Sequence, residues 1–375
     1  MKPVDRCGLW AGLLAVSGAL AGCGGASQTP PPAAAGPEDA WVAPASLGNR
    51  GPAGAGADVT GGAGGMTVRV GTPAQLRHEL CRSAPAGACI DDTPRIIEIA
   101  TEIDLGDAAG RGLPVGSNKT VLGIGANAAV KGKGFVLQNG AGNVVIRNLS
   151  ITDATDAVTI ADARRVWIDH NRFTRIACRF IVTGTADHFG AASEVTISWN
   201  EFDGNRAGSV RCDDRPGWML LLQGNGRLSF ANNWLHDFSG RGPRVEGDAL
   251  LHVVNNHFQD GAWEALDTVG RTTHVLVEGN YFENVSLPLA RRADAAPVFA
   301  LLAQTPAARA GCRAALGRDC APNIANPVSA TNRFTEDAAV LDAAKAAPPG
   351  SIVLPAPADR VPALVSAGVG IGHIR

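Results

Sequence analysis

The sequence predicts an all-β protein whose main domain is a right-handed parallel β-helix, a solenoid with a short N-terminal capping helix and an irregular C-terminal segment. One pattern of two apolar residues, an asparagine and a further apolar residue occurs five times. Its second apolar position falls at Ile168, Ile197, Phe230, Val253 and Val277. The intervals of 29, 33, 23 and 24 residues are typical of stacked coils. In addition, 45% of the 375 residues are hydrophobic, enough for one long core.

The first residues are typical of an export signal. Two basic residues precede an apolar run over residues 8–20, which is too short to span a bilayer. The following Leu20-Ala21-Gly22-Cys23 resembles the lipobox of bacterial lipoprotein precursors, whose cysteine becomes the lipidated first residue. We therefore expect a signal peptide over residues 1–23 and a protein that Cys23 anchors to a membrane at the cell envelope or cell surface, or that is released from there. The alternative is an ordinary secretory signal with an incidental cysteine.

Composition then divides the rest of the chain. Residues 24–65 are mostly Gly, Ala, Pro, Ser and Gln, which predicts a flexible linker, so the solenoid domain is expected over residues 66–375. Helical spacing from Thr72 to Arg82 predicts a helix that caps the first coil, since an open end of parallel strands would invite pairing with another chain. Residues 301–375 break the repeat, and we expect them to wrap the outside and the far end.

Each copy of the repeat predicts a short strand followed by a bend. Two apolar residues at period two turn one face inward, and asparagine suits the bend because it tolerates left-handed backbone geometry. Stacked asparagines could also form a ladder of side-chain hydrogen bonds. The ladder would contain Asn171, Asn200, Asn233, Asn256 and Asn280. The two longer intervals predict inserted loops at residues 174–194 and 203–227, where a binding face is expected. A β-sandwich is the alternative, but a fixed asparagine in every copy favours coils.

Export permits disulfides, and six cysteines remain after Cys7 and Cys23 are set aside. Cys81 with Cys89 and Cys312 with Cys320 are each close in sequence, so these two loops are easily closed. Cys178 and Cys212 remain as a possible long-range pair, and the connectivity stays open. The formal net charge is −2 without a long basic run, which argues against nucleic acid as a partner. We expect a monomer.

Four segments resemble the pectate lyase and pectin lyase family. They are Val166-Trp167-Ile168-Asp169-His170-Asn171, the stretch from Ser239-Gly240-Arg241-Gly242-Pro243-Arg244 to Asn256, the stretch from Glu278 to Val285, and Cys312 through Arg318 to Cys320. In consistent order they span roughly residues 95 to 325. The resemblance implies a polysaccharide lyase that cleaves a pectin-type polymer by β-elimination.

Within that family the sequence is closer to the pectin lyase branch. Two acidic calcium ligands of the pectate lyases correspond to Cys178 and Val182 here, and the loop that carries a lysine in those enzymes reads Arg215-Pro216-Gly217-Trp218. The final arginine of their Arg-x-Pro-x-x-Arg motif is Glu246 here. A free uronate resists the second negative charge that elimination creates, and calcium relieves this problem, whereas a methyl ester is neutral. The resemblance therefore implies esterified pectin as substrate and no metal or other cofactor.

The resemblance also implies the catalytic residues. Arg241 matches the base that removes the proton beside the carboxyl group. Arg179 and Arg244 would stabilise the negative charge that develops there, with Arg175 as the alternative to Arg179 because residues 186–194 contain no arginine. Asp169 would orient an arginine or a sugar hydroxyl, or it is a structural carboxylate at a bend. Asp156 and the sugar-stacking residues Trp167, Trp218 and Trp263 complete the expected substrate site.

Three other functions compete with this interpretation. A calcium-dependent pectate lyase would use Asp156 and Asp169 with further ligands. A non-catalytic surface lipoprotein would only bind polysaccharide, but it would have no need to keep Arg241 and Arg244 together. A polygalacturonase would need two carboxylates flanking the bond, and the adjacent Asp213-Asp214 suggest it, although such pairs are common in solvated turns.

Overall fold

A computed structural model describes residues 51–53, 57–83, 89–106, 112–184, 193–205, 218–290, 292–327, 334–348 and 350–374. These residues lie within one compact unit, residues 46–375. Cys23, Cys212 and Asp213-Asp214 lie outside the described residues, so the predictions that fall on them are not tested by the fold. Among the described residues, no helix is both long and apolar enough to cross a membrane.

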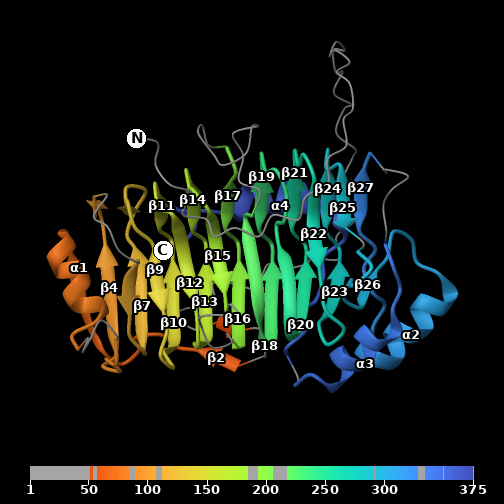
Figure 1. The fold of residues 1–375 in the computed structure, drawn as a ribbon, viewed down its shortest axis with the longest axis horizontal. Helices are drawn as coiled ribbons and strands as arrows, with labels where there is room; N and C mark the ends of the chain where they lie inside the picture. The colour runs from red at the N-terminus through yellow and green to blue at the C-terminus, as the bar shows by residue number, and fades with distance from the viewer. Residues whose placement is uncertain are drawn as a thin grey trace, which may run out of the picture. The chain divides into compact units, whose positions relative to one another are not determined.

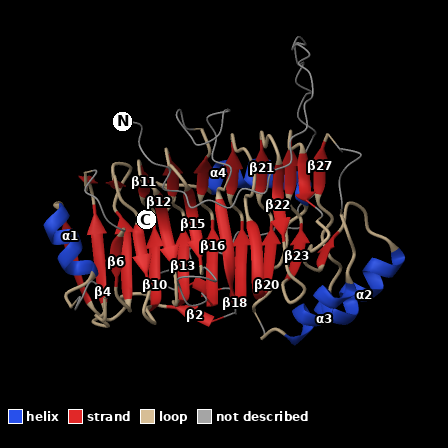
Figure 2. Ribbon diagram, viewed as in Figure 1, coloured by secondary structure: helices blue, strands red, loops and turns tan. Residues whose placement is uncertain are grey.

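Parallel strands stack into two sheets around one core, as predicted (Figure 1, Figure 2). Among the described residues the larger sheet has 16 strands in two rows, and β18 (Leu220–Ala231) and β20 (Arg244–Val254) run through both rows. Row 1 also contains β3 (Met66–Val70), β4 (Arg95–Ile99), β7 (Lys119–Gly123), β10 (Gly142–Arg147), β13 (Arg164–Asp169), β16 (Ser193–Ser198), β23 (His274–Glu278) and β26 (Val298–Ala300). Row 2 also contains β6 (Leu113–Val115), β9 (Phe135–Leu137), β12 (Asp156–Ile160), β15 (Arg179–Thr183), β22 (Glu264–Thr268) and β25 (Leu287–Ala290).

The nine-stranded sheet closes the coils. Its strands are β5 (Glu102–Asp104), β8 (Ala129–Lys131), β11 (Ser150–Thr152), β14 (Arg172–Thr174), β17 (Glu201–Asp203), β19 (Trp234–His236), β21 (His257–Gln259), β24 (Tyr281–Glu283) and β27 (Ile324–Asn326). The last apolar position of the repeat lies in these strands and points inward. Phe173 stacks on Phe202 with ring centres 4.9 Å apart, and Phe258 stacks on Phe282 at 4.8 Å. Each buried ring contributes about 2–3 kcal/mol through the apolar surface that it removes from water.

The asparagine ladder is confirmed, with one correction to its geometry. Asn171 donates its backbone N–H and its Nδ2 to Oδ1 of Asn200, at 2.9 and 3.0 Å, and the same pair of bonds continues along the stack. Asn323 extends the ladder by one more coil. The left-handed residue is the one before each asparagine, such as His170 with φ 50°. Asparagine is therefore needed at the bend for its amide rather than for its backbone freedom.

Helices lie at both ends of the solenoid (Figure 1). As predicted, α1 (Pro73–Leu80) covers the first coil with buried Leu76 and Leu80, and Thr72 caps it. At the far end lie α2 (Pro306–Leu316) and α3 (Ala338–Ala346), while α4 (Val361–Gly368) packs against aromatic residues of the nine-stranded sheet. The repeat does not stop at residue 301 as expected, because β27 and Asn323 add another coil.

Disulfide bonds join Cys81 to Cys89 and Cys312 to Cys320, as the sequence suggested. Cys178 is also disulfide-bonded. Whether Cys212 is its partner lies outside the described residues. Disulfides of this kind are typical of exported proteins, because intracellular thiols are kept reduced.

The predicted linker boundary at residue 65 is too late. Gly51–Ala53 (β1) and Ala57–Val59 (β2) form an antiparallel pair, and Val59 is buried against Val145 and Trp167. The backbone N–H groups of Thr60 and Gly61 donate to Asn143 Oδ1. A side chain at Gly61 would overlap the Thr120 hydroxyl. The small residues here permit close packing on row 1, which composition alone cannot distinguish from flexibility.

A buried ion pair near the far end predicts how stability depends on pH. Glu278 on β23 accepts two bonds of 2.8 Å from Arg318 and one of 3.1 Å from His252 Nε2. Burial would raise the pKa of Glu278, but its bonds to Arg318 and His252 outweigh this and lower it from 4.5 to about 2. The carboxylate therefore contributes stability above pH 4.5, and this contribution is lost as pH falls toward 2.

The difference between these pKa values corresponds to about 3 kcal/mol. Urea unfolding of the wild-type protein and of Glu278→Gln from pH 6 to pH 2.5 measures it. We expect the wild type to lose stability more steeply in this window, and Glu102→Gln, at an exposed position, to behave like the wild type. Parallel curves for the wild type and Glu278→Gln would contradict this assignment.

Candidate active site

Arg241 and Arg244 lie where β20 begins in row 2, between β18 and β22. Register pairs Leu221 with Arg244 and Arg244 with Asp267, so these side chains occupy one line across three neighbouring strands. Because strand side chains alternate between faces, Val245 and Leu266 point into the core while Arg244 and Asp267 point outward. The outer face of row 2 at this place is the candidate active site.

A buried carboxylate holds the arginines of the site. Asp267 has no exposed surface, and its oxygens lie 3.2 Å from Nε of Arg241, 3.0 Å from Nη1 of Arg244 and 2.7 Å from Nε of Arg292. Burial would raise the pKa of Asp267, but the three guanidinium groups outweigh burial and the pKa is lowered. Asp267 is therefore a carboxylate at neutral pH that fixes three cationic side chains.

Trp218 provides the aromatic surface of the site. The guanidinium carbon of Arg241 lies 4.0 Å from the centre of the Trp218 ring, and that of Arg244 lies 5.7 Å away. Arg244 also pairs with Glu246 at 2.9 Å, and Glu264 lies 3.8 Å from Arg241. The side chains of Arg241 and Arg244 remain 16% and 19% exposed, so both can be reached by a ligand while their orientation is fixed.

Asp156 and Arg179 lie in the same row. Arg179 on β15 forks onto Asp156 on β12 with two bonds of 2.9 and 2.7 Å. Ile181 on β15 pairs with Leu220 on β18, and this register, continued by two residues, places Arg179 opposite Trp218. The register of β18 with β20, continued in the same direction, places Trp218 opposite Arg241. Trp263, which is 48% exposed, lies beside Gly240. The predicted residues that the structure brings together are Asp156, Arg179, Trp218, Arg241, Arg244 and Trp263.

Asp169 and Trp167 are not part of this site, which corrects two expectations. Both are on the outer face of β13 in row 1, where Val59 packs against Trp167. Asp169 is buried and accepts hydrogen bonds from Arg147 and Ser198, so it is a structural carboxylate. Trp167 is only 3% exposed and cannot stack on a sugar ring. Their outward orientation was expected correctly, but both side chains are buried on that face.

Sequence reasoning missed Asp267 and Arg292. The spacing of the coils could have located Asp267, because one coil here is 23 residues long and Asp267 lies 23 residues after Arg244. Applying the same spacing to Arg241 leads to Glu264. Arg292 follows the next strand, β25, and its pKa is raised by the hydrogen bond to Asp267.

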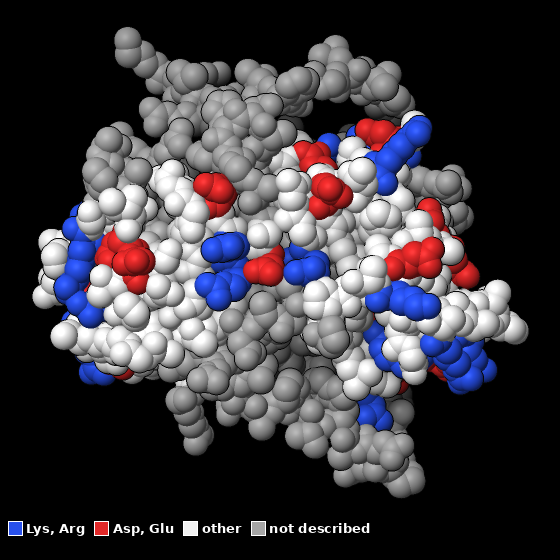
Figure 3. Space-filling view, turned by 90° about the horizontal axis from the view of Figure 1, so that it is seen from below, with Lys and Arg blue, Asp and Glu red and all other residues white. Residues whose placement is uncertain are grey.

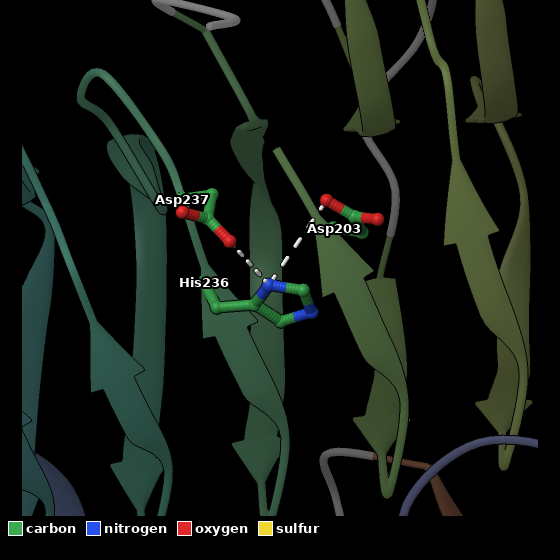
Figure 4. A group of neighbouring side chains, drawn as sticks. All are labelled: Asp203, His236 and Asp237. Carbon is green, nitrogen blue, oxygen red and sulfur yellow. Dashed lines mark hydrogen bonds and ion pairs between the residues drawn. The ribbon is translucent and has the colours of Figure 1, made fainter. Parts of the chain in front are cut away.

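The positions expected to match calcium ligands offer no carboxylate. Cys178 is disulfide-bonded, and Val182 is a buried apolar residue beside Leu221. Another group of possible ligands lies on the nine-stranded sheet, away from row 2, where Nδ1 of His236 is 2.9 Å from Asp237 and 4.0 Å from Asp203 (Figure 4). Burial lowers the pKa of His236, but Glu201 and Asp237 outweigh this and raise it.

Charge on the surface is mixed. Among the described side chains on the face shown in Figure 3, Lys and Arg lie close to Asp and Glu. Positive charge therefore does not form an extended patch on the part of that face that the structure describes.

A parallel β-helix with an arginine cluster on one outer face defines a class of carbohydrate-active protein, and comparisons specify the family. Residues 42–319 match the family described as pectate lyase. Probable pectin lyase E of Aspergillus fumigatus is 41% identical over 276 residues, which is 70% of this chain and 69% of that protein. Probable pectin lyase F of Neosartorya fischeri is 40% identical over 276 residues, with the same coverage of both chains.

Solved structures show the same fold. The pectate lyase of Bacillus sp. N165 in complex with trigalacturonate is 20% identical, with a TM-score of 0.58 over 84% of this chain and 97% of that chain. The chain belongs to the pectate lyase family and is a polysaccharide lyase.

Proposed function

We propose that the protein cleaves methyl-esterified polygalacturonate by β-elimination at Arg241. The observation that carries the proposal is the line of Arg179, Trp218 and Arg241 across row 2, beside apolar Val182 and Leu221. In this register an arginine lies on each side of Trp218, and no carboxylate is present at the two positions that correspond to calcium ligands. An uncharged ester fits such a surface, and the names of the related pectin lyases support the same substrate.

The reaction needs positive charge where the negative charge develops. In this proposal Arg241 acts as a neutral guanidine and takes the proton from the carbon next to the ester, while the electrons of that C–H bond form the new C=C double bond. The bond to the neighbouring glycosidic oxygen breaks, and this oxygen takes a proton from water. The enolate-like charge on the ester oxygen is stabilised by Arg244 and Arg179, whose positions are set before the reaction by Asp267 and Asp156. Trp218 and Trp263 contribute surfaces on which sugar rings stack.

The test compares highly esterified with demethylated polygalacturonate and follows unsaturated product by its ultraviolet absorbance. We expect faster product formation from the esterified polymer. New reducing ends without unsaturated product would indicate a polygalacturonase, and binding without cleavage would indicate the non-catalytic alternative.

Activity is expected not to require calcium, because Cys178 and Val182 offer no ligand oxygen. Exhaustive chelation should leave the rate on esterified substrate within about twofold of the untreated enzyme, since no metal ion takes part in the proposed reaction. Addition of calcium should likewise change it little. If chelation abolished turnover and calcium restored it, the enzyme would be a calcium-dependent pectate lyase.

We also propose that the protein is exported and acts as a monomer that is lipid-anchored through Cys23. The tetrapeptide before Cys23 and the disulfides in the folded unit support this. Mass spectrometry of the mature chain should find an acylated N-terminal Cys23, and Cys23→Ser should abolish the modification and release the protein from membranes. A mature chain that begins elsewhere, or that lacks acyl groups, would contradict the anchor.

A further inference from the structure

One histidine and two aspartates meet on the nine-stranded sheet, where two neighbouring strands end (Figure 4). Asp203 ends β17 and His236 ends β19, and these two residues pair in register. Asp237 follows in left-handed backbone geometry, with φ 55°. Both carboxylates point toward Nδ1 of the imidazole. The three ligand atoms lie within 4.8 Å of one another, so the side chains can reach a common point.

The distances at this point suit a small divalent metal ion. Zinc binds nitrogen and carboxylate oxygen at about 2.0–2.2 Å in tetrahedral geometry, which places its ligand atoms about 3.4 Å apart. Nδ1 of His236 lies 2.9 Å from Asp237 and 4.0 Å from Asp203, on either side of that value. A proton on Nδ1 can be donated to Asp237 only, because 4.0 Å is too long for a hydrogen bond. A divalent cation would neutralise both carboxylates at once.

The other ring nitrogen of His236 has a partner that suits a metal ligand. Nε2 lies 3.4 Å from Oε1 of Glu201, whose Oε2 is held by Nε of Arg172 at 3.1 Å. When Nδ1 binds a metal, the proton stays on Nε2 and is donated to Glu201, which fixes the tautomer and makes the imidazole a stronger ligand. The Trp234 ring, with its centre 4.3 Å from that of His236, restrains the imidazole from one side.

The ligand types favour zinc over calcium. Calcium takes six to eight oxygen ligands, whereas one imidazole nitrogen with two carboxylates suits zinc and neighbouring transition metals. The side chains of Asp203 and Asp237 are 24% and 37% exposed, so water can complete the coordination. Oδ1 of Asp203 also accepts the N–H of Asn205 at 2.9 Å, which orients this carboxylate and leaves a lone pair for the metal.

We propose that Asp203, His236 and Asp237 form a zinc site that joins two coils of the solenoid. The ion would link β17 to β19 on the sheet that closes the coils, whereas Arg241 and Arg244 lie on row 2. Zinc would therefore stabilise the fold and take no part in the elimination. The inference does not depend on the proposed function.

Calorimetry with zinc chloride on the untagged full chain, freed of metal beforehand, tests the site. The wild type should bind one equivalent. His236→Gln and Asp237→Asn should each weaken binding at least about 100-fold because a ligand is lost, and Glu201→Gln about tenfold because only its partner is lost. Asp260→Asn is the matched control. Asp260 has the place of Asp237 in the next coil, with φ 54°, but its partner is Asn284 rather than a histidine.

Thermal unfolding provides a second measurement. Zinc at 100 times its Kd should raise the Tm of the wild type and of Asp260→Asn by about 4 °C, and calcium should not. Unfolding in chelator shows which variants fold, and Asp237→Asn, at a 37% exposed position, keeps the test decisive if His236→Gln does not. Turnover should change less than about twofold when zinc is removed.

Three results would overturn the zinc site as proposed. The first is a wild type that binds no zinc. The second is zinc binding by Asp237→Asn as tight as that of the wild type. The third is a loss of turnover on zinc removal from protein that stays folded, which would place the ion in the reaction instead of in the sheet.

Discussion

Arg241→Ala is expected to lower the turnover of esterified polygalacturonate by about 10²–10³-fold while KM changes little. Arg241 acts on the proton and on charge that exists only in the transition state, so its removal should affect kcat rather than ground-state binding. Its side chain is held by Asp267 on one side and by the Trp218 ring on the other. Both contacts depend on the planar guanidinium group. Arg241→Lys should therefore lose a similar factor although it keeps the charge.

Arg175→Ala is the matched control for this experiment. Arg175 also forks onto an aspartate, Asp153, but it lies at the end of β14 in the nine-stranded sheet and is 57% exposed. We expect near-native turnover from it, and thermal unfolding should confirm that all three variants fold. Near-native turnover of Arg241→Lys would show that positive charge alone is sufficient. Near-native turnover of Arg241→Ala would remove the catalytic assignment altogether.

Asp267→Asn is expected to destabilise the fold by about 3–5 kcal/mol and to abolish most of the turnover, because it leaves three guanidinium groups around a neutral amide. The carboxylate has no exposed surface, so water cannot replace it. An amide has only one acceptor oxygen, and its NH₂ group presents donors to donors. Arg241 and Arg244 should then move away from each other and from Trp218, which removes the arrangement that the reaction needs.

Asp156→Asn provides the comparison, since Asp156 pairs with a single arginine and is 22% exposed. Its cost in stability should be nearer 1 kcal/mol. Adding Arg292→Ala to Asp267→Asn removes one unpaired cation and should recover part of the stability but not the turnover. Urea unfolding and kcat, measured on the same preparations, check both expectations. An Asp267→Asn protein with wild-type stability would show that the three arginines do not depend on this carboxylate.

The fold could be predicted from the sequence because the coil imposes its period on the chain. Ile168, Ile197 and Phe230 each mark an inward strand position, and the following asparagine must bond to its equivalent in the next coil. Such positions tolerate few alternatives. The residue before each asparagine is less constrained by its side chain, as His170, Trp199 and Asn232 show, so the left-handed position could not be located from residue type.

The site was less predictable, for two physical reasons. Arg179, Arg241 and Arg244 were found by resemblance to a family, since in a chain with 33 basic residues no single arginine is conspicuous. Asp267 was missed because its partners are 23 and 26 residues away in sequence and meet it only when the coils are stacked. Asp169 was misplaced because an outward position does not reveal whether neighbouring side chains, here Arg147 and Ser198, enclose it.

The merging of the two rows has a mechanical consequence. From Leu221 opposite Arg244 to Ala231 opposite Val254, β18 and β20 pair over eleven positions without an intervening turn. In the preceding coils described, a bend separates row 1 from row 2 and can act as a joint between two short strands. At the active site the bend lies inside the strands themselves, at Gly226 and Gly247, whose φ angles are 129° and 111°, and the cross-strand register continues through it. Arg241 and Arg244 lie at the start of this paired segment, so a shift of their backbone would have to disturb a ladder that runs through both rows.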